Sequence, residues 1–408
     1  MNKILQQYEE LCKDMKKFET EKLPLCAAET YISDFCKAPL LSNFEGKYSF
    51  VDHAGVDSFI GGEFIVRLNQ LLNSECNALF HANYSNADTL TGINCFTVCA
   101  MAVLSREDRV LITSPEQGGH ASIPIILKSL GIQYDSIPYN YEEYQINYEQ
   151  LNDLCSTKKY NFLIFCQSDI LNPPDLRKVK LPPNMGIIYD GTQTLGLMIA
   201  NLVQNPLDVG ENVILIGGAH KTLPAPACGL IMTNNITYEE KLKHNITPHF
   251  LRNTQPNHIA ALLMALIEQE TFGKQYQEKV VFFANTLANE LEQLDFRLAK
   301  LQSCIYTYTH QIFILMGNTE TDNFYYKAKK YNITLNAKHK RLFSNDGIRL
   351  GTQQIARYNW TCEDISMLAQ LLYFVNRGEE CDRQIRALRK QLIAKKTPQF
   401  TFENITIK

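Results

Sequence analysis

A lysine directly follows a strand-like apolar run near the middle of the chain. Val213-Ile-Leu-Ile is followed by two glycines, Ala219, His220 and Lys221. A lysine that leaves the end of a buried strand is partly desolvated, which lowers its pKa and makes its neutral amine nucleophilic. Lys221 is therefore a candidate to form a Schiff base with a carbonyl compound. Taken alone, a surface lysine at a strand end is the more common alternative.

An aspartate ends a second strand-like run earlier in the chain. Gly186-Ile-Ile-Tyr is followed by Asp190, and ligands of α/β sheets bind at the carboxyl ends of the strands. Pyridoxal phosphate needs both a lysine, which carries its aldehyde as an imine, and a carboxylate, which keeps its ring nitrogen protonated. The alternative for Asp190 is a helix N-cap. Asp190 and Lys221 together favour a pyridoxal-phosphate site over either alternative.

These residues lie in a region where short aliphatic runs alternate with longer helical segments. Short strands without in/out alternation are buried on both faces, which is typical of a mostly parallel sheet covered by helices, so the sequence predicts an α/β protein. The run 229–233 is expected to be antiparallel, because only about a dozen residues separate it from the strand before it. The predicted parallel strands are 109–113, 161–166, 186–189 and 213–216.

From about Asn257 the pattern changes to a smaller α+β unit. Helical spacing covers 257–272, 276–294, 322–331 and 363–376, and strand-like runs cover 312–316, 333–335 and 348–350. We therefore expect an N-terminal arm at residues 1–45, a large cofactor-binding domain at 46–272 and a small C-terminal domain at 273–408.

Composition narrows the class of protein. The 408 residues are 45% hydrophobic and 20% charged with a formal net charge of -3, so disorder is excluded and two or three packed units are expected. Opposite charges nearly balance, which argues against nucleic acid or an anionic membrane as a partner. No apolar run approaches the roughly 20 residues of a membrane-spanning helix. Met1 to Asp14 is typical of an amphipathic helix rather than a secretion signal, so a cytoplasmic protein is expected.

Cysteines and short motifs exclude further classes. The twelve cysteines are expected to be mostly buried free thiols. Cys95 and Cys99 share a helix face but lack two further ligands, so no metal site is predicted. The chain has neither a dinucleotide-binding G-x-G-x-x-G motif nor a P-loop nor a G-x-S-x-G motif.

Three motifs resemble the serine hydroxymethyltransferases, a family of fold-type I pyridoxal-phosphate enzymes. His220-Lys221-Thr222-Leu223 is similar to the family's T-H-K-T-L, which carries the Schiff-base lysine. Asp190-Gly-Thr-Gln193 resembles D-x-A-H, whose Asp contacts the pyridine nitrogen, with Gln193 in place of the His. Gly347-Ile-Arg349-Leu-Gly-Thr matches G-I-R-x-G-T, whose Arg binds the substrate's α-carboxylate. The resemblance covers nearly the whole chain. It implies an aspartate aminotransferase-like fold, the cofactor pyridoxal 5'-phosphate and catalytic roles for Lys221 and His220.

Further positions complete the resemblance. Gly118-Gly119-His120 matches the family's G-G-H, whose imidazole stacks on the cofactor ring, and Ser168 stands where the family has a serine near the ring hydroxyl. Thr89-Leu90-Thr91-Gly-Ile-Asn aligns with S-G-S-Q-A-N, which opens a helix and binds the phosphate, so Leu90 and Thr91 are expected cofactor contacts. Glu45-Gly46 resembles Y-x-E-G, whose Glu is an acid/base and substrate-binding residue supplied by the neighbouring subunit. The resemblance thus implies a homodimer with shared active sites; the alternative for Glu45 is a solvent-exposed loop acid.

The chain departs from the family where substrate and folate bind. Ala28-Glu-Thr replaces S-E-N, and Ile60 replaces a tyrosine of Y-Y-G-G, with about seven extra residues before it. The segment between the strand at Ile333 and Gly347 is shorter than in the family and lacks its pterin-contacting elements. The cofactor contacts therefore resemble the family more than the folate contacts do.

These observations predict a pyridoxal-phosphate enzyme acting on a small amino acid of the glycine, serine or threonine type. We expect aldol or retro-aldol chemistry at the Cα–Cβ bond, in a folate-independent aldolase or transaldolase. One alternative is a tetrahydrofolate-dependent serine hydroxymethyltransferase. Another is a non-catalytic protein that keeps the fold for binding or regulation, although the joint presence of Lys221, Asp190 and Arg349 argues against it.

Overall fold

The computed structural model describes residues 2–51, 57–302 and 304–402 and divides into two compact units. The larger unit comprises Thr30–Glu278 and Phe400–Lys408, and the smaller unit comprises Met1–Glu29 and Lys279–Gln399. Part of the predicted insertion before Gly61, residues 52–56, lies outside the described residues.

A seven-stranded sheet forms the centre of the larger unit, in the order β2-β10-β9-β8-β7-β3-β4. Strands β3, β4, β7, β8 and β9 pair in parallel, whereas β10 runs antiparallel to both β9 and β2. This confirms the predicted mostly parallel sheet and the reversed direction of 229–233. The strands are β2 (Tyr84–Asn86), β3 (Arg109–Ile112), β4 (Gln133–Ser136), β7 (Phe162–Cys166), β8 (Gly186–Asp190), β9 (Val213–Gly218) and β10 (Gly229–Thr233).

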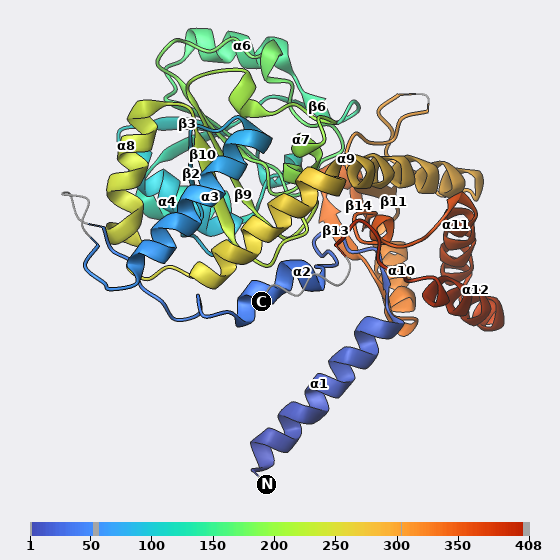
Figure 1. Cartoon of the computed structure of the whole chain (residues 1–408). Coiled ribbons are helices and arrows are strands. Elements are labelled where there is room, and N and C mark those ends of the chain that lie inside the picture. Colours follow the sequence, from blue (N-terminus) through green and yellow to red (C-terminus); the bar gives the residue numbers. More distant parts are fainter. Residues whose placement is uncertain (1, 52–56, 303, 403–408) are drawn as a thin grey trace. The chain divides into compact units, whose positions relative to one another are not determined.

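Helices cover both faces of this sheet (Figure 1). Alternate strand residues pack into two separate apolar clusters: Leu163 and Leu215 contribute to one, Ile164 and Ile214 to the other. Residues of α3 (Gly62–Phe80) and α9 (Pro256–Gln293) belong to the first cluster, and residues of α4 (Gly92–Val103) and α5 (Ser122–Leu130) to the second. Burial on both faces explains why the strands lack alternating polar residues.

The remaining elements of the larger unit are short or lie in connections. They are α2 (Asp34–Lys37), η1 (Ala38–Leu41), η2 (Pro115–Gln117), β5 (Tyr139–Asn140), β6 (Gln145–Ile146), α6 (Tyr148–Thr157), η3 (Leu176–Lys178), α7 (Leu195–Ile199), η4 (Pro206–Asp208), α8 (Ile236–Asn245) and the π-helical turn η5 (Ile246–Phe250).

The smaller unit is an α+β arrangement around the antiparallel sheet β11-β14-β13. It begins with the predicted N-terminal helix, α1 (Lys3–Glu21), none of whose residues is buried. The two helices predicted at 257–272 and 276–294 form one continuous helix, α9, whose last part belongs to this unit. The other elements are β1 (Leu23–Pro24), β11 (Gln311–Leu315), α10 (Asn318–Lys330), β12 (Ile333–Thr334), β13 (Asn336–Lys340), η6 (Arg341–Phe343), β14 (Asn345–Gly351), η7 (Ile355–Arg357), α11 (Cys362–Arg377), η8 (Glu379–Cys381) and α12 (Asp382–Ala394).

All twelve cysteines are free, and nine of them are buried, which confirms the expectation of mostly buried thiols. Cys95 and Cys99 both point into the core from α4, as their spacing indicates. Within residues 2–51, 57–302 and 304–402, no helix combines the length and apolar character needed to cross a bilayer. The same residues contain no group of three or more His, Cys, Asp or Glu side chains suited to a metal ion.

Candidate active site

Lys221 and Asp190 follow the carboxyl ends of two adjacent strands. Asp190 is the last residue of β8, and Lys221 lies three residues beyond the end of β9. The two strands pair in parallel, with Asp190 opposite Ile216. The charges of both residues act on the thiol of Cys166 at the end of β7. The structure therefore brings the predicted amine and carboxylate to one edge of the sheet.

Both oxygens of the Asp190 carboxylate accept a hydrogen bond. Oδ1 accepts from the backbone N–H of Thr192 at 2.8 Å, and Oδ2 accepts from Sγ of Cys166 at 3.0 Å. Burial raises the pKa of Cys166 well above its ordinary value, and the Asp190 charge raises it further, so the thiol keeps its proton and donates it. The orientation of the carboxylate is thus fixed by two donors, neither of which the sequence analysis singled out.

His220 is a neutral imidazole at neutral pH. Burial, followed by the neighbouring charge of Lys221, lowers its pKa from 6.5 to about 4, against a smaller opposing effect of Asp190. Its Nδ1 is buried and has no hydrogen-bond partner among the described residues. The ring beside Lys221 therefore carries a buried nitrogen atom that no described residue hydrogen-bonds.

The N-terminus of α4 approaches the same edge. Thr91 is its N-cap, and its side chain accepts from the backbone N–H of Asn94 at 3.3 Å. A Cβ at Gly218, the last residue of β9, would lie 2.9 Å from the backbone nitrogen of Gly92, so the strand end and the helix start can be this close only as glycines. The Gly218 N–H in turn donates to Oγ1 of Thr192 at 2.8 Å.

The loop with His120 lies along the end of β7. The backbone N–H of His120 donates to the Cys166 carbonyl at 2.8 Å, and that of Ser168 donates to the Gly118 carbonyl at 2.7 Å. Nδ1 of His120 accepts from the backbone N–H of Ser122 at 3.2 Å. His120 and Ser168 are therefore held next to the strand that also carries the thiol partner of Asp190.

Three other predicted residues differ in their surroundings. Gln193 is buried, and its backbone carbonyl accepts a hydrogen bond from Oγ1 of Thr222 at 2.9 Å. Leu90 is half-exposed. Glu45 is exposed, and its carboxylate accepts from the side-chain amide of Asn257 at the start of α9. Glu45 is thus tied to its own chain in the structure of the single chain, and its assignment to a partner's site stays a prediction.

Arg349 belongs to the smaller unit, where it lies in β14 and is 5% exposed. Its guanidinium donates to Oδ1 of Asn336, the residue opposite it on β13, at 2.9 Å. The same amide oxygen accepts from Sγ of Cys26 at 3.4 Å. The role of Arg349 in binding the substrate's carboxylate stays a prediction.

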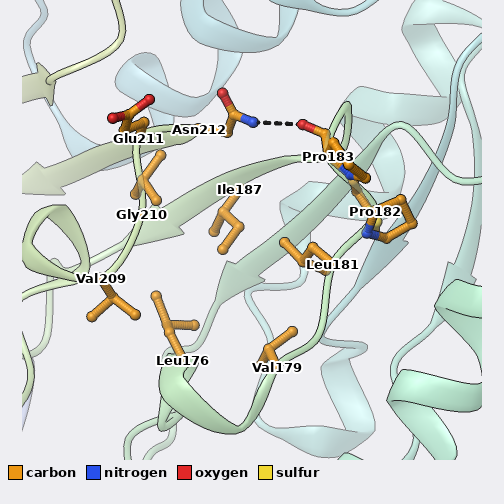
Figure 2. A pocket seen from close by; sticks show the side chains of 12 residues that line it. Leu176, Val179, Leu181, Pro182, Pro183, Ile187, Val209, Gly210, Glu211 and Asn212 are labelled. Atoms are coloured by element: carbon orange, nitrogen blue, oxygen red, sulfur yellow. Dashed lines mark hydrogen bonds between the residues drawn. The ribbon is translucent and has the colours of Figure 1, made fainter.

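A separate pocket lies at the opposite edge of the sheet, beside the amino ends of β8 and β9 (Figure 2). It has a volume of about 210 Å³ and apolar walls that include Leu176, Leu181, Ile187 and Val209. Because Asp190 and Lys221 lie past the carboxyl ends of these strands, this pocket is not part of their site.

The residues at the carboxyl edge fit pyridoxal phosphate in three respects. A helix N-terminus with a threonine cap is suited to a phosphate dianion. A doubly hydrogen-bonded carboxylate and an amine on neighbouring strand ends match the ring nitrogen and the aldehyde carbon, respectively. Lys221 would hold the aldehyde, Asp190 the ring nitrogen, and Thr91 with the first amides of α4 the phosphate.

This fold and site define the class as a fold-type I pyridoxal-phosphate enzyme. The family model described as serine hydroxymethyltransferase matches residues 2–372. The chain belongs to the serine hydroxymethyltransferase family and is an enzyme of the pyridoxal-phosphate-dependent transferase or lyase type, so the non-catalytic alternative is set aside.

Curated relatives named serine hydroxymethyltransferase match along most of their length. The protein from Methanothermobacter thermautotrophicus is 25% identical over 375 residues, covering 89% of this chain and 88% of the relative. The one from Sulfolobus acidocaldarius is 24% identical over 412 residues, covering 95% and 92%. Among solved structures, the L-threonine transaldolase from Pseudomonas fluorescens in its internal aldimine state matches with a TM-score of 0.90 and 20% identity, covering 98% of this chain and 94% of that chain.

Proposed function

We propose that this chain uses pyridoxal phosphate to make or break the Cα–Cβ bond of a small amino acid of the glycine, serine or threonine type, without tetrahydrofolate. The observation that carries the proposal is the meeting of Lys221, Asp190 and the capped start of α4 at one sheet edge. When bound there, pyridoxal phosphate supplies a ring that accepts the electrons released at Cα.

Each residue has a separate task in this proposal. Nζ of Lys221 binds the aldehyde carbon, and the Asp190 carboxylate holds a proton on the ring nitrogen. Arg349 binds the substrate's α-carboxylate, since a guanidinium matches a carboxylate with two parallel hydrogen bonds. The neutral His220 takes up or releases a proton at Nδ1, which has no partner among the described residues. His120 covers one face of the ring, and Ser168 and Gln193 contact its edge.

Two features support folate independence. Ile60, at the position of a family tyrosine, is fully exposed. The shortened segment before Gly347 is a hairpin whose turn, η6, buries Phe343 against Phe313 with ring centroids 4.3 Å apart. The buried phenylalanine of this turn offers no hydrogen-bond partner to a pterin, and each lost buried partner costs about 1–3 kcal/mol. The name of the structural neighbour, a threonine transaldolase, agrees with this choice.

The proposal includes a cytoplasmic homodimer in which Glu45 contributes to the active site of the neighbouring subunit, while Leu90 contacts the cofactor beside Thr91. Analytical ultracentrifugation of the cofactor-loaded protein tests the dimer. A monomer that turns over substrate would overturn this part of the proposal.

The reaction is tested with the cofactor-loaded protein and threonine, serine or glycine. We expect threonine cleavage, detected as acetaldehyde, and exchange of acetaldehyde for a second aldehyde, with rates unchanged by tetrahydrofolate. The Lys221→Ala variant is the control and should be inactive in both assays.

The second candidate is the tetrahydrofolate-dependent hydroxymethyltransferase, which the names of the curated relatives favour. Calorimetry of tetrahydrofolate binding separates the two. Micromolar tetrahydrofolate affinity together with serine turnover that requires it would replace the folate-independent proposal with this one.

A further inference from the structure

A buried glutamine of α9 contacts the segment that carries Lys221. Gln277 is completely buried, and its Nε2 donates to the backbone carbonyl of Thr222 at 2.7 Å. Thr222 directly follows Lys221 and is also completely buried. Both residues belong to the larger unit. The side chain of Gln277 therefore fixes the peptide group between Thr222 and Leu223, one residue beyond the candidate cofactor lysine.

The same threonine is held from the side of Asp190. Its Oγ1 donates to the Gln193 carbonyl at 2.9 Å and accepts from the backbone N–H of Gly196 at 3.3 Å. Gln193 and Gly196 lie in the segment that follows Asp190 at the end of β8. Thr222 thus links the segment that carries the candidate amine to the segment that carries the candidate carboxylate.

The contact between the two segments has no spare room. A Cβ at Gly196 would lie 2.4 Å from the Thr222 carbonyl oxygen and 2.4 Å from Nε2 of Gln277. The Gln277 amide therefore sits where the backbone of α7 comes close to Thr222 at Gly196. Any other side chain at position 277 has to satisfy the carbonyl of Thr222 in that small space.

The arrangement leaves two buried polar atoms unsatisfied. Nε2 of Gln277 also donates to Oε1 of Gln269 at 2.9 Å. Oε1 of Gln277 and Nε2 of Gln269 are buried and have no hydrogen-bond partner among the described residues. A buried polar atom without a partner is costly, and apolar side chains of similar size would avoid that cost. A polar pair at this place is better explained by the geometry that it fixes.

We infer that Gln277 is a positioning residue for Lys221. By holding the Thr222 carbonyl, it sets the distance between the Lys221 amine and the Asp190 carboxylate, which bind opposite ends of one cofactor ring. The inference rests on the proposed function in that Lys221 is the cofactor lysine. A small displacement of Lys221 relative to Asp190 weakens both the binding of the cofactor and its covalent attachment to Lys221, because both residues must fit the same rigid molecule.

The test compares Gln277→Met, which removes the donor and keeps the length, with Gln275→Met. Gln275 is exposed on the same helix and serves as the matched control. Three quantities are measured: the Kd of pyridoxal phosphate for the cofactor-free protein, the fraction of cofactor trapped on Lys221 by borohydride, and the melting temperature of the cofactor-free protein.

We expect Gln277→Met to bind pyridoxal phosphate about ten-fold more weakly, the effect of roughly one lost hydrogen bond. The trapped fraction should fall as well, while the melting temperature should fall by no more than about 5 °C: the variant leaves the Thr222 carbonyl and Oε1 of Gln269 without their donor, but it also removes the unpaired Oε1 of Gln277. The double variant Gln269→Met/Gln277→Met should bind as weakly as the single variant and melt no lower than wild type.

Two results would overturn the inference while leaving the proposed function intact. One is wild-type affinity and trapping in Gln277→Met. The other is a loss of affinity accompanied by a large drop in melting temperature in both the single and the double variant, which indicates a purely structural role. A wild-type chain that fails to bind pyridoxal phosphate would instead overturn the proposed function itself.

Discussion

Acidification should destabilise the cofactor-free protein through His220. The pKa of its imidazole is lowered to about 4 in the folded chain, mainly by burial, from the ordinary 6.5. The unfolded chain therefore takes up a proton at this residue as the pH falls below about 6.5, whereas the folded chain does so only near pH 4. The contribution of His220 to the free energy of unfolding is fully present above about pH 6.5 and is lost as the pH falls from 6.5 to about 4. Below pH 4 this residue lowers the free energy of unfolding no further.

The size of the effect follows from the two pKa values. One pKa unit corresponds to about 1.4 kcal/mol, so the full difference is about 3 kcal/mol, and about 2 kcal/mol should be lost between pH 7 and pH 4.5. This is a substantial part of the free energy of unfolding of an ordinary protein, which is about 5–15 kcal/mol.

The measurement is urea unfolding of the cofactor-free protein at pH 7 and pH 4.5, for wild type and His220→Asn. Carboxylates titrate in both proteins, so their contribution cancels when the two pH differences are compared. Wild type should lose about 2 kcal/mol more than the variant over this interval. Equal losses would show that the imidazole is not desolvated and would refute the neutral His220 at the strand edge.

Three further predictions concern the site. Lys221→Ala should abolish borohydride trapping of pyridoxal phosphate, and trapping on another lysine, found by peptide mapping, would contradict the assignment. Arg349→Lys should weaken amino-acid affinity at least ten-fold, since a lysine cannot make two parallel hydrogen bonds, with little change in cofactor affinity; unchanged amino-acid affinity by spectroscopic titration would refute the clamp. Gly218→Ala should cost about 1–3 kcal/mol in urea unfolding and weaken cofactor binding, because its Cβ would overlap Gly92; a variant as stable and as tightly binding as wild type would show that the contact has room.

Most of the large unit could be predicted because its strands are buried on both faces. Continuous apolar runs ending in Asp190 or a Gly-Gly pair are visible without knowledge of the fold, and parallel pairing then places their ends together. The reversed direction of β10 followed from the short connection before it. The division of α9 into two helices was wrong, because Gly273 and its polar neighbours interrupt the apolar pattern while the packed helix continues through them. One glycine costs a helix only about 1 kcal/mol, less than packing supplies.

The partners of the site residues could not be predicted, because they depend on how distant segments pass each other. Cys166 looked like one more core residue of a strand, and only the register with β8 places its thiol at Asp190. Gln277 did carry a signal in retrospect, since it and Gln269 are glutamines on the core-facing side of α9. Which carbonyl such a buried amide meets, however, is decided by tertiary packing alone.

The distribution of the thiols has a practical consequence for labelling. The three exposed cysteines, Cys12, Cys304 and Cys362, all belong to the smaller unit. Alkylating reagents attack the thiolate, and burial raises the pKa of Cys95 in the larger unit to about 12, so such buried thiols are protected. Maleimide dyes or spin labels can therefore be attached to the smaller unit of the unmodified chain, leaving the segments with Lys221 and Asp190 chemically untouched. Pairs of these probes would report on distances within that unit while the cofactor is titrated, without a cysteine-free background.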